Sequence, residues 1–371
     1  MAAETHIEWV KGDDGSNGAT WNPITGCSVI SAGCRRCYAM TLAGTRLAHT
    51  PSRQGLTQMT NAGPVWNGQV RFNAQWLGQP LQWKRARRIF VCAHGDLFHE
   101  NVPDDWIDRI FAVMALAPQH TFMVLTKRSD RMRRYFAEVT FDRIIASCRG
   151  EDGISLIPRH TMREIEHHFG MHPESSLRFR RVTWPLPNVW VGVSVEHQEA
   201  ADTRIPDLMQ VPAAVRWISA EPLLGPINMR WAPYAHHATG ESYREYLDRR
   251  GGINEYEALR QLDWIVVGGE SGEGARPMNP AWALSLRDQC EAAGVPFFFK
   301  QWGSHCGGTG QASMFIHLCN GQSSAGNRHT VEWPDGYVSQ PMPKKRAGRT
   351  LFGQTFDEMP HGKEGGHAVA A

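Results

Sequence analysis

Three cysteines near the amino end are the residues of this chain best suited to chemistry. Cys27, Cys34 and Cys37 follow one another with the spacing C-x6-C-x2-C, and no fourth cysteine or histidine lies in the surrounding stretch, residues 20–38. A structural zinc site normally has four protein ligands, whereas a catalytic metal keeps one position free for substrate. Three close thiols therefore favour a metal centre with an open position.

Ionisable side chains form a second set of candidates, because one follows nearly every apolar run further along the chain. The carboxyl ends of parallel strands converge on one pocket in barrels and doubly wound sheets, so we expect these side chains around a single mouth. The alternative is that they meet solvent where the chain leaves the sheet or cap the next helix. The set is Asp96, Lys127, Glu196, Glu221, Glu270 and Lys300.

The elements that position these residues are short apolar runs alternating with amphipathic stretches, a pattern typical of a mainly parallel sheet. Residues 104–115 and 280–290 are predicted helices, and Gly294 ends the second. Trp21–Ile24 is a candidate first strand, which places the cysteines in the loop after it. The other predicted strands, apolar on both faces as buried parallel strands are, cover residues 88–93, 121–126, 189–194, 215–219, 264–268 and 296–300.

Length and composition fit a globular α/β protein. The 371 residues are 42% hydrophobic, enough to bury a sizeable core in one domain over residues 1–360. Stretches at about 147–186 and 229–262 interrupt the strand–helix rhythm and are interpreted as insertions, which form lids, partner surfaces or simple loops. Residues 361–371 are rich in Gly, His and Ala and are predicted to be disordered.

The first residues, the apolar runs and the net charge bear on where the protein is located and what it binds. Residues 1–6 lack a basic start and an apolar run, so we expect no secretory signal, a cytoplasmic location and reduced thiols. No uncharged apolar run approaches the roughly 20 residues that span a bilayer, so we do not expect a membrane protein. A net charge of +2 does not identify a partner.

Two glycine-containing segments have the composition of ligand contacts. Gly268 and Gly269 let the backbone approach a ligand closely, although neither nucleotide phosphate-loop pattern is present. Gly95 precedes a cluster of two carboxylates and His99, which suits acid–base groups, metal ligands or a hydrogen-bonded loop. For His99 the hydrogen-bonded loop is the favoured interpretation.

The remaining thiols form no second close cluster in the sequence. Cys92 and Cys290 fall on strand and helix patterns and are predicted to be buried apolar residues. Cys306 and Cys319 are separated by the loop-like run 307–310, and we interpret them as incidental loop thiols in preference to ligands.

The motifs together resemble the radical S-adenosylmethionine superfamily, whose enzymes hold a [4Fe-4S] cluster on three cysteines after the first strand of a partial (βα)6-type parallel barrel. The narrower resemblance is to the phage-associated three-cysteine-motif proteins, a family of unassigned activity, over about residues 18–360. The segments that carry it are 20–27, 34–39, 96–99, 192–196, 220–223, 268–272 and 299–303.

This resemblance implies a fold with two insertions and a set of cofactor contacts. Cys27, Cys34 and Cys37 would bind three irons, leaving the fourth for the amino and carboxylate groups of S-adenosylmethionine. Gly95 and Asp96 would meet the methionine amine, Ser194 and Glu196 the ribose or carboxylate, and Gly268 with Gly269 the adenine. The strand-end residues Asp96, Glu196, Glu221, Glu270 and Lys300 are the catalytic candidates.

The leading hypothesis is an iron–sulfur, S-adenosylmethionine-dependent radical enzyme supplied with electrons by a reductant protein. Basic and aromatic residues mix in 82–88 and 127–136, a composition that suits a nucleic-acid or nucleotide substrate, or alternatively a helix surface with its aromatics in the core. A second hypothesis is a zinc-stabilised nucleic-acid- or protein-binding module completed by His94 or His99. A third is a barrel that binds a dedicated partner protein through its insertions.

Overall fold

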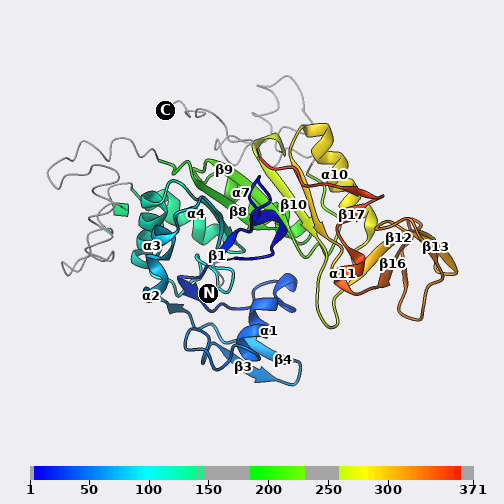
Figure 1. The fold of residues 1–371 in the computed structure, drawn as a ribbon, viewed down its shortest axis with the longest axis horizontal. Coiled ribbons are helices and arrows are strands. Elements are labelled where there is room, and N and C mark those ends of the chain that lie inside the picture. Colours follow the sequence, from blue (N-terminus) through cyan, green and yellow to red (C-terminus); the bar gives the residue numbers. More distant parts are fainter. Residues whose placement is uncertain (1–3, 141–142, 145–146, 148–183, 230–258, 361–371) are drawn as a thin grey trace.

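The computed structural model describes residues 4–140, 143–144, 147, 184–229 and 259–360. Within these residues a seven-stranded parallel sheet curls into a half-barrel, with the strands in the order β1-β6-β7-β8-β9-β10-β11 (Figure 1). The strands are β1 (Ala19–Trp21), β6 (Arg88–Val91), β7 (Thr121–Thr126), β8 (Val189–Ser194), β9 (Val215–Ala220), β10 (Trp264–Gly268) and β11 (Phe297–Gln301).

The convex face of the sheet packs against helices. Alternate residues of a strand point to opposite faces, so in β8 the side chains of Val191 and Val193 face the helices while Trp190 and Ser194 face the concave side. Apolar residues of each helix complete the large core on the convex face. The helices are α3 (Asp104–Leu116), α4 (Ser129–Glu138), α7 (Gln198–Met209) and α10 (Pro280–Ala293).

A cluster of tryptophans fills the amino-end half of the concave side. Trp9, in the 3-10 helix η1 (Glu8–Val10), packs its ring 4.8 Å from Phe90 and 5.2 Å from Trp217, centroid to centroid. Trp217 in turn lies 5.6 Å from Trp264. The residues nearer the carboxyl ends on the same face are small or polar, for example Ser194 and Ser219. The concave side is therefore closed at one end and hollow at the other.

A second, five-stranded antiparallel sheet follows β11 and lies beside the half-barrel (Figure 1, orange). The sequence-based interpretation of 307–310 as a loop is wrong, because these residues lie inside a strand. Gly307 is needed there, since a β-carbon would lie 2.6 Å from the rings of Pro280 and Trp302. The strands are β12 (His305–Gln311), β13 (Met314–His317), β14 (Ser323–Ser324), β15 (Val331–Glu332) and β16 (Tyr337–Pro341).

Shorter elements flank the cysteine loop and the end of the described chain. Hairpin β3–β4 packs on α1, and the antiparallel pair β2–β5 holds the chain just before Cys27. These elements are β2 (Ile24–Thr25), η2 (Ala32–Cys34), α1 (Tyr38–Gly44), β3 (Thr57–Thr60), β4 (Gly63–Trp66), β5 (Arg71–Phe72), α2 (Ala74–Leu77), η3 (Gln79–Gln82), η5 (Leu259–Gln261), α11 (Lys344–Ala347), β17 (Thr350–Leu351) and β18 (Gln354–Thr355).

The six strands predicted after residue 87 are confirmed as β6 to β11, and both predicted helices are present as α3 and α10. The predicted first strand, Trp21–Ile24, is wrong in its bounds: β1 ends at Trp21, and Ile24 pairs with Phe72 in another sheet. Most of both predicted insertions, and the tail 361–371, lie outside the described residues. No helix in the described ranges is long and apolar enough to cross a membrane.

Candidate functional site

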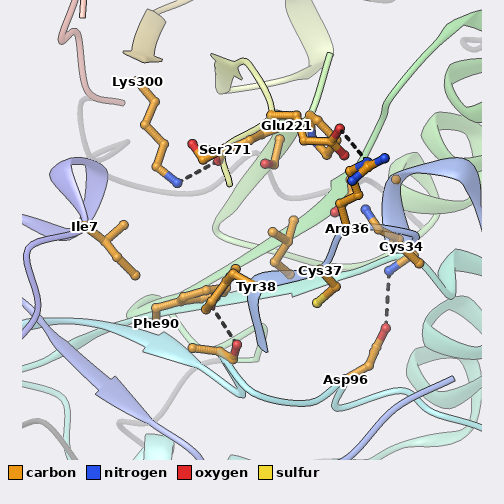
Figure 2. A pocket seen from close by; sticks show the side chains of 18 of the residues that line it. Ile7, Cys34, Arg36, Cys37, Tyr38, Phe90, Asp96, Glu221, Ser271 and Lys300 are labelled. Atoms are coloured by element: carbon orange, nitrogen blue, oxygen red, sulfur yellow. Dashed lines mark hydrogen bonds and ion pairs between the residues drawn. The ribbon is translucent and has the colours of Figure 1, made fainter. Parts of the chain in front are cut away.

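A cavity of about 550 Å³ opens at the carboxyl ends of the parallel strands. Its walls come from the cysteine loop, the ends of β6 to β11 and the η1 segment, so elements far apart in the sequence meet there. Figure 2 shows Cys34 and Cys37 close to Arg36, with Asp96 and Lys300 contributed by other strand ends. The predicted site residues that line it are Cys27, Cys34, Cys37, Gly95, Asp96, Lys127, Ser194, Glu221, Gly269, Glu270 and Lys300.

The cysteine loop is anchored to the end of β6 by glycines. Gly26 has φ +97°, a conformation that a larger residue rarely adopts, and forms a parallel bridge with Gly95. The Gly26 amide also donates to the carbonyl of His94 at 3.1 Å. Gly33 packs directly on a carboxylate, because a β-carbon there would lie 2.4 Å from Glu196 Oε1. The loop can therefore bring three thiols to the cavity only with glycine at these positions.

The three thiols are spread more widely than the ligands of a single ion. A tetrahedral zinc with bonds of about 2.3 Å holds its sulfurs about 3.8 Å apart. Within the described residues, three potential ligand atoms all lie within 4.8 Å of one another only at Cys306, His317 and Cys319, so Cys27, Cys34 and Cys37 are spread more widely. Neither His94 nor His99 joins them in such a group. An iron–sulfur cluster requires a wider spread, because each thiolate binds a different iron.

Burial controls the protonation of the thiols. Burial raises the pKa of Cys27 to about 12, with Asp96 adding to the shift and Arg128 opposing it. Burial also raises the pKa of Cys37. These two free thiols are therefore protonated at neutral pH, and a metal or cluster would bind by displacing their protons.

Arg128 joins the cysteine loop to the ends of β6 and β7. Its guanidinium contacts Asp96 Oδ2 at 2.9 Å, Ser28 Oγ at 2.6 Å and Cys27 Sγ at 3.5 Å. Asp96 also accepts a hydrogen bond from Thr126 Oγ1 at 2.7 Å. Both charged groups are almost fully buried. This pair fixes the position of Cys27 relative to the sheet.

Glu196 is placed beneath the cysteine loop and does not line the cavity. It has no exposed surface and lies between Lys127 Nζ at 2.7 Å and Arg204 Nη1 at 2.8 Å. Ser31 of the loop donates to Oε1, the oxygen that Lys127 also contacts, at 2.8 Å. Burial alone would raise the pKa of Glu196, but the two cations outweigh it and lower the pKa to about 2. Glu196 therefore supports the loop in this structure.

The remaining strand-end carboxylates are also neutralised by neighbouring cations. Glu221 accepts from Lys300 Nζ at 2.7 Å and from Gln301 Nε2 at 2.9 Å. Glu270 pairs with Arg276 and lies 4.0 Å from Arg36 Nε. Lys300 and Glu221 keep part of their side chains exposed to the cavity. They are the ionisable pair best placed to meet a bound molecule.

Several residues of the site were not among the predicted site residues. Trp9, Tyr38, Phe90 and Arg36 line the cavity although none follows a predicted strand as an ionisable residue. Gly268, predicted as a cofactor contact, is not part of the lining, and its neighbour Gly269 is. His99 is hydrogen-bonded to Ser28 Oγ at 3.0 Å, which confirms the loop interpretation for that residue.

The run 127–136 is used mainly inside the protein. Tyr135 and Phe136 are buried in the core, and Arg131 and Arg133 pair with Asp104 and Asp207. The aromatic rings of this run are buried, as the helix-surface interpretation predicts.

The fold and the site together define a class of protein, a parallel α/β half-barrel with a three-cysteine loop at its open end. The chain belongs to DUF5131, a family described as a protein of unknown function, whose model matches residues 4–360. No curated protein and no solved structure matches the chain.

Proposed function

We propose that this protein is an iron–sulfur, S-adenosylmethionine-dependent radical enzyme. The observation that carries the proposal is the position of Cys27, Cys34 and Cys37, which come from one loop and line one cavity at the carboxyl ends of a parallel half-barrel. The resemblance to the phage-associated three-cysteine-motif proteins and to the radical S-adenosylmethionine superfamily supports the same assignment.

The three cysteines would hold a [4Fe-4S] cluster, and the adjoining cavity would hold S-adenosylmethionine. When bound, these cofactors would supply reductive cleavage of a sulfonium carbon–sulfur bond, with one electron coming from a reductant protein. The protein contributes binding, orientation and protection from side reactions.

The chain's own residues have separable tasks in this proposal. Asp96, held by Arg128 and Thr126, places carboxylate oxygens beside the cysteine loop, where they could accept from a bound ammonium group. Gly95 and Gly269 let the chain pack closely at the cavity wall, because a β-carbon would lie 3.0 Å from the Ile24 carbonyl oxygen and 2.0 Å from the Trp302 carbonyl oxygen, respectively. The tryptophan cluster behind Trp9 closes the inner end of the cavity and excludes water from it.

The substrate would meet the charged part of the cavity wall. Lys300, Glu221 and the cation of Arg36 line it together with the ring of Tyr38, which is 53% exposed. Cations beside an exposed ring suit a nucleotide or a nucleic-acid base with its phosphate, so we propose that substrate class.

Metal analysis of protein purified without oxygen tests the cluster. We expect a brown protein with about four irons and about four sulfides per chain, absorbing near about 400 nm. Cys34→Ala should lose the colour and most of the iron, whereas Cys290→Ala, at a buried thiol in α10, should keep both. A colourless wild-type protein without iron, after reconstitution with iron and sulfide, would rule out the cluster.

Cofactor chemistry is tested separately on reconstituted protein. Under strong reductant, S-adenosylmethionine should be cleaved to methionine and 5′-deoxyadenosine by the wild type and not by Cys34→Ala. Iron binding without any cleavage would reject the enzyme while retaining the cluster.

A further inference from the structure

A second group of metal-binding side chains lies in the antiparallel sheet, away from the three-cysteine loop. Cys306 is in β12, His317 ends β13, and Cys319 follows two residues later. The pairing of Gly308 with His317 brings these positions together across the hairpin. Their Sγ and imidazole nitrogen atoms all lie within 4.8 Å of one another.

His317 has a buried nitrogen without a partner. The side chain is only 5% exposed, and its Nδ1 atom makes no hydrogen bond within the described residues. The other nitrogen, Nε2, lies 2.8 Å from Ser324 Oγ. A buried polar atom without a partner is unfavourable, and metal-binding histidines typically use their second nitrogen for such an orienting hydrogen bond. The tautomer that donates from Nε2 leaves the Nδ1 lone pair available for a ligand.

The two sulfurs complete the donor set. Cys306 is fully buried, and its Sγ lies 2.7 Å from Cys319 Sγ. A bound ion with bonds of about 2.3 Å would hold the sulfurs about 3.8 Å apart, so each needs to move by only about half an ångström. Two thiolates and an imidazole are the soft and borderline ligands that zinc prefers.

We propose that Cys306, His317 and Cys319 bind one Zn²⁺ ion, separate from the cluster site. Three protein ligands leave the fourth position of the tetrahedron for water. Thr350 donates to the carbonyl of Cys319 at 2.5 Å, so the ion would also stabilise the contact between this hairpin and β17, which pairs with β18 near the end of the described chain. The site does not depend on the proposed radical chemistry.

Zinc content and affinity, measured on the full chain, test the site. We expect one zinc per chain in wild type and in a variant with Cys27, Cys34 and Cys37 all replaced by alanine, which lacks the cluster site. Cys319→Ser should lose the zinc and keep the iron. Because one variant should lose only the zinc and the other only the cluster, failure of this proposal can be told apart from failure of the proposed function.

A gentler substitution covers the case in which Cys319→Ser fails to fold. Ser324→Ala removes only the hydrogen bond to His317 and should weaken zinc affinity, measured by competition with a chelator, by about 10–100-fold. Ser323→Ala, one residue away in β14 and exposed, should leave the affinity unchanged. Equal affinities for the two variants would overturn the proposal.

Two further results would also reject it. Added Zn²⁺ that fails to bind the reduced wild type with a stoichiometry of one would show that there is no site. A disulfide between Cys306 and Cys319 in protein purified under reducing conditions, detected by mass, would show that the thiols serve as a covalent link instead.

Discussion

At the scale of single residues, the site is dominated by buried ion pairs. Glu196 is the clearest case, because it is fully buried and bonded to two cations and to the cysteine loop. Removing one partner of such a group leaves the remaining charges buried without compensation, which costs more than the pair contributes. Replacing a single oxygen of Glu196 should therefore weaken the contact that holds the cysteine loop.

Glu196→Gln should reveal this support through its pH dependence. The folded pKa of about 2 lies below the ordinary 4.5, so the unfolded chain binds the extra proton between these values. The stabilisation is complete above about pH 4.5 and is lost as the pH falls towards 2, with a full size of about 3 kcal/mol.

Urea unfolding of the wild type and of Glu196→Gln, from pH 7 to pH 3, measures this stabilisation. The wild type should be more stable by about 3 kcal/mol at pH 7, and the difference should shrink below about pH 4.5. A difference that is the same at pH 7 and pH 3 would assign the loss to packing instead of charge.

Gly33→Ala tests the contact between loop and carboxylate directly. The added β-carbon would meet Glu196 Oε1, which cannot move aside because Lys127 and Ser31 hold it. We expect a loss of about 1–3 kcal/mol in unfolding free energy and a lower iron content after reconstitution. Gly78→Ala is the matched control, since nothing lies within 4 Å of a β-carbon there. Similar iron content in both variants would contradict this account of the loop.

At the scale of elements, strands were predictable where both faces are buried and unpredictable where glycine dominates. The run 264–268 has apolar residues on both faces, and such runs have few alternatives to a central parallel strand. The run 307–310 has three glycines whose small size allows Pro280, Trp302 and Phe315 to pack close. That reason exists only in the tertiary structure, so the sequence pattern indicated a loop.

The η1 segment has only three residues but makes a large contribution to the stability of the fold. Trp9 is 2% exposed and packs on Phe90, Trp217 and Trp264. Trp9→Ala should lower the unfolding free energy by about 3–5 kcal/mol, and Trp9→Phe by less, because a ring still fills part of the space. Thermal and urea unfolding measure both. An unchanged stability of Trp9→Ala would show that the segment does not pack in this way in solution.

At the scale of the whole molecule, the end of the described chain returns to the outer edge of the parallel sheet. Phe299 donates its amide to the carbonyl of Phe356 at 2.8 Å, and Trp264 Nε1 donates to the carbonyl of Glu358 at 2.7 Å. An open sheet edge is a template for pairing with other chains, and this segment covers it.

Truncation after Gly353 should therefore expose the β11 edge. We expect a lower midpoint of thermal unfolding and self-association, both measurable by calorimetry and size-exclusion chromatography. Truncation after Pro360, which removes only residues outside the described part, is the control and should match the full chain. A stable monomer from the chain that ends at Gly353 would contradict the covering role.

Some of the residues that surround the cavity could be predicted from the sequence, but how they pair could not. The strand-end positions of Asp96, Glu221 and Lys300 follow from the parallel sheet, since all carboxyl ends meet at one edge. The pairing of Glu221 with Lys300, and the burial of Glu196 beneath the loop, depend on how long side chains turn once the strands are in place. No spacing in the chain encodes those directions.

The closed inner end of the half-barrel has a kinetic consequence. Since the tryptophans around Trp9 fill the amino-end side, in the part of the chain that the structure describes a molecule would reach the cysteines from the carboxyl-end side. Two ligands sharing one entrance bind in a fixed sequence, the deeper before the shallower, and the products depart in reverse. If the protein is the enzyme proposed above, its steady-state kinetics should follow a compulsory order of addition, in which excess of the outer ligand inhibits by blocking entry of the inner one.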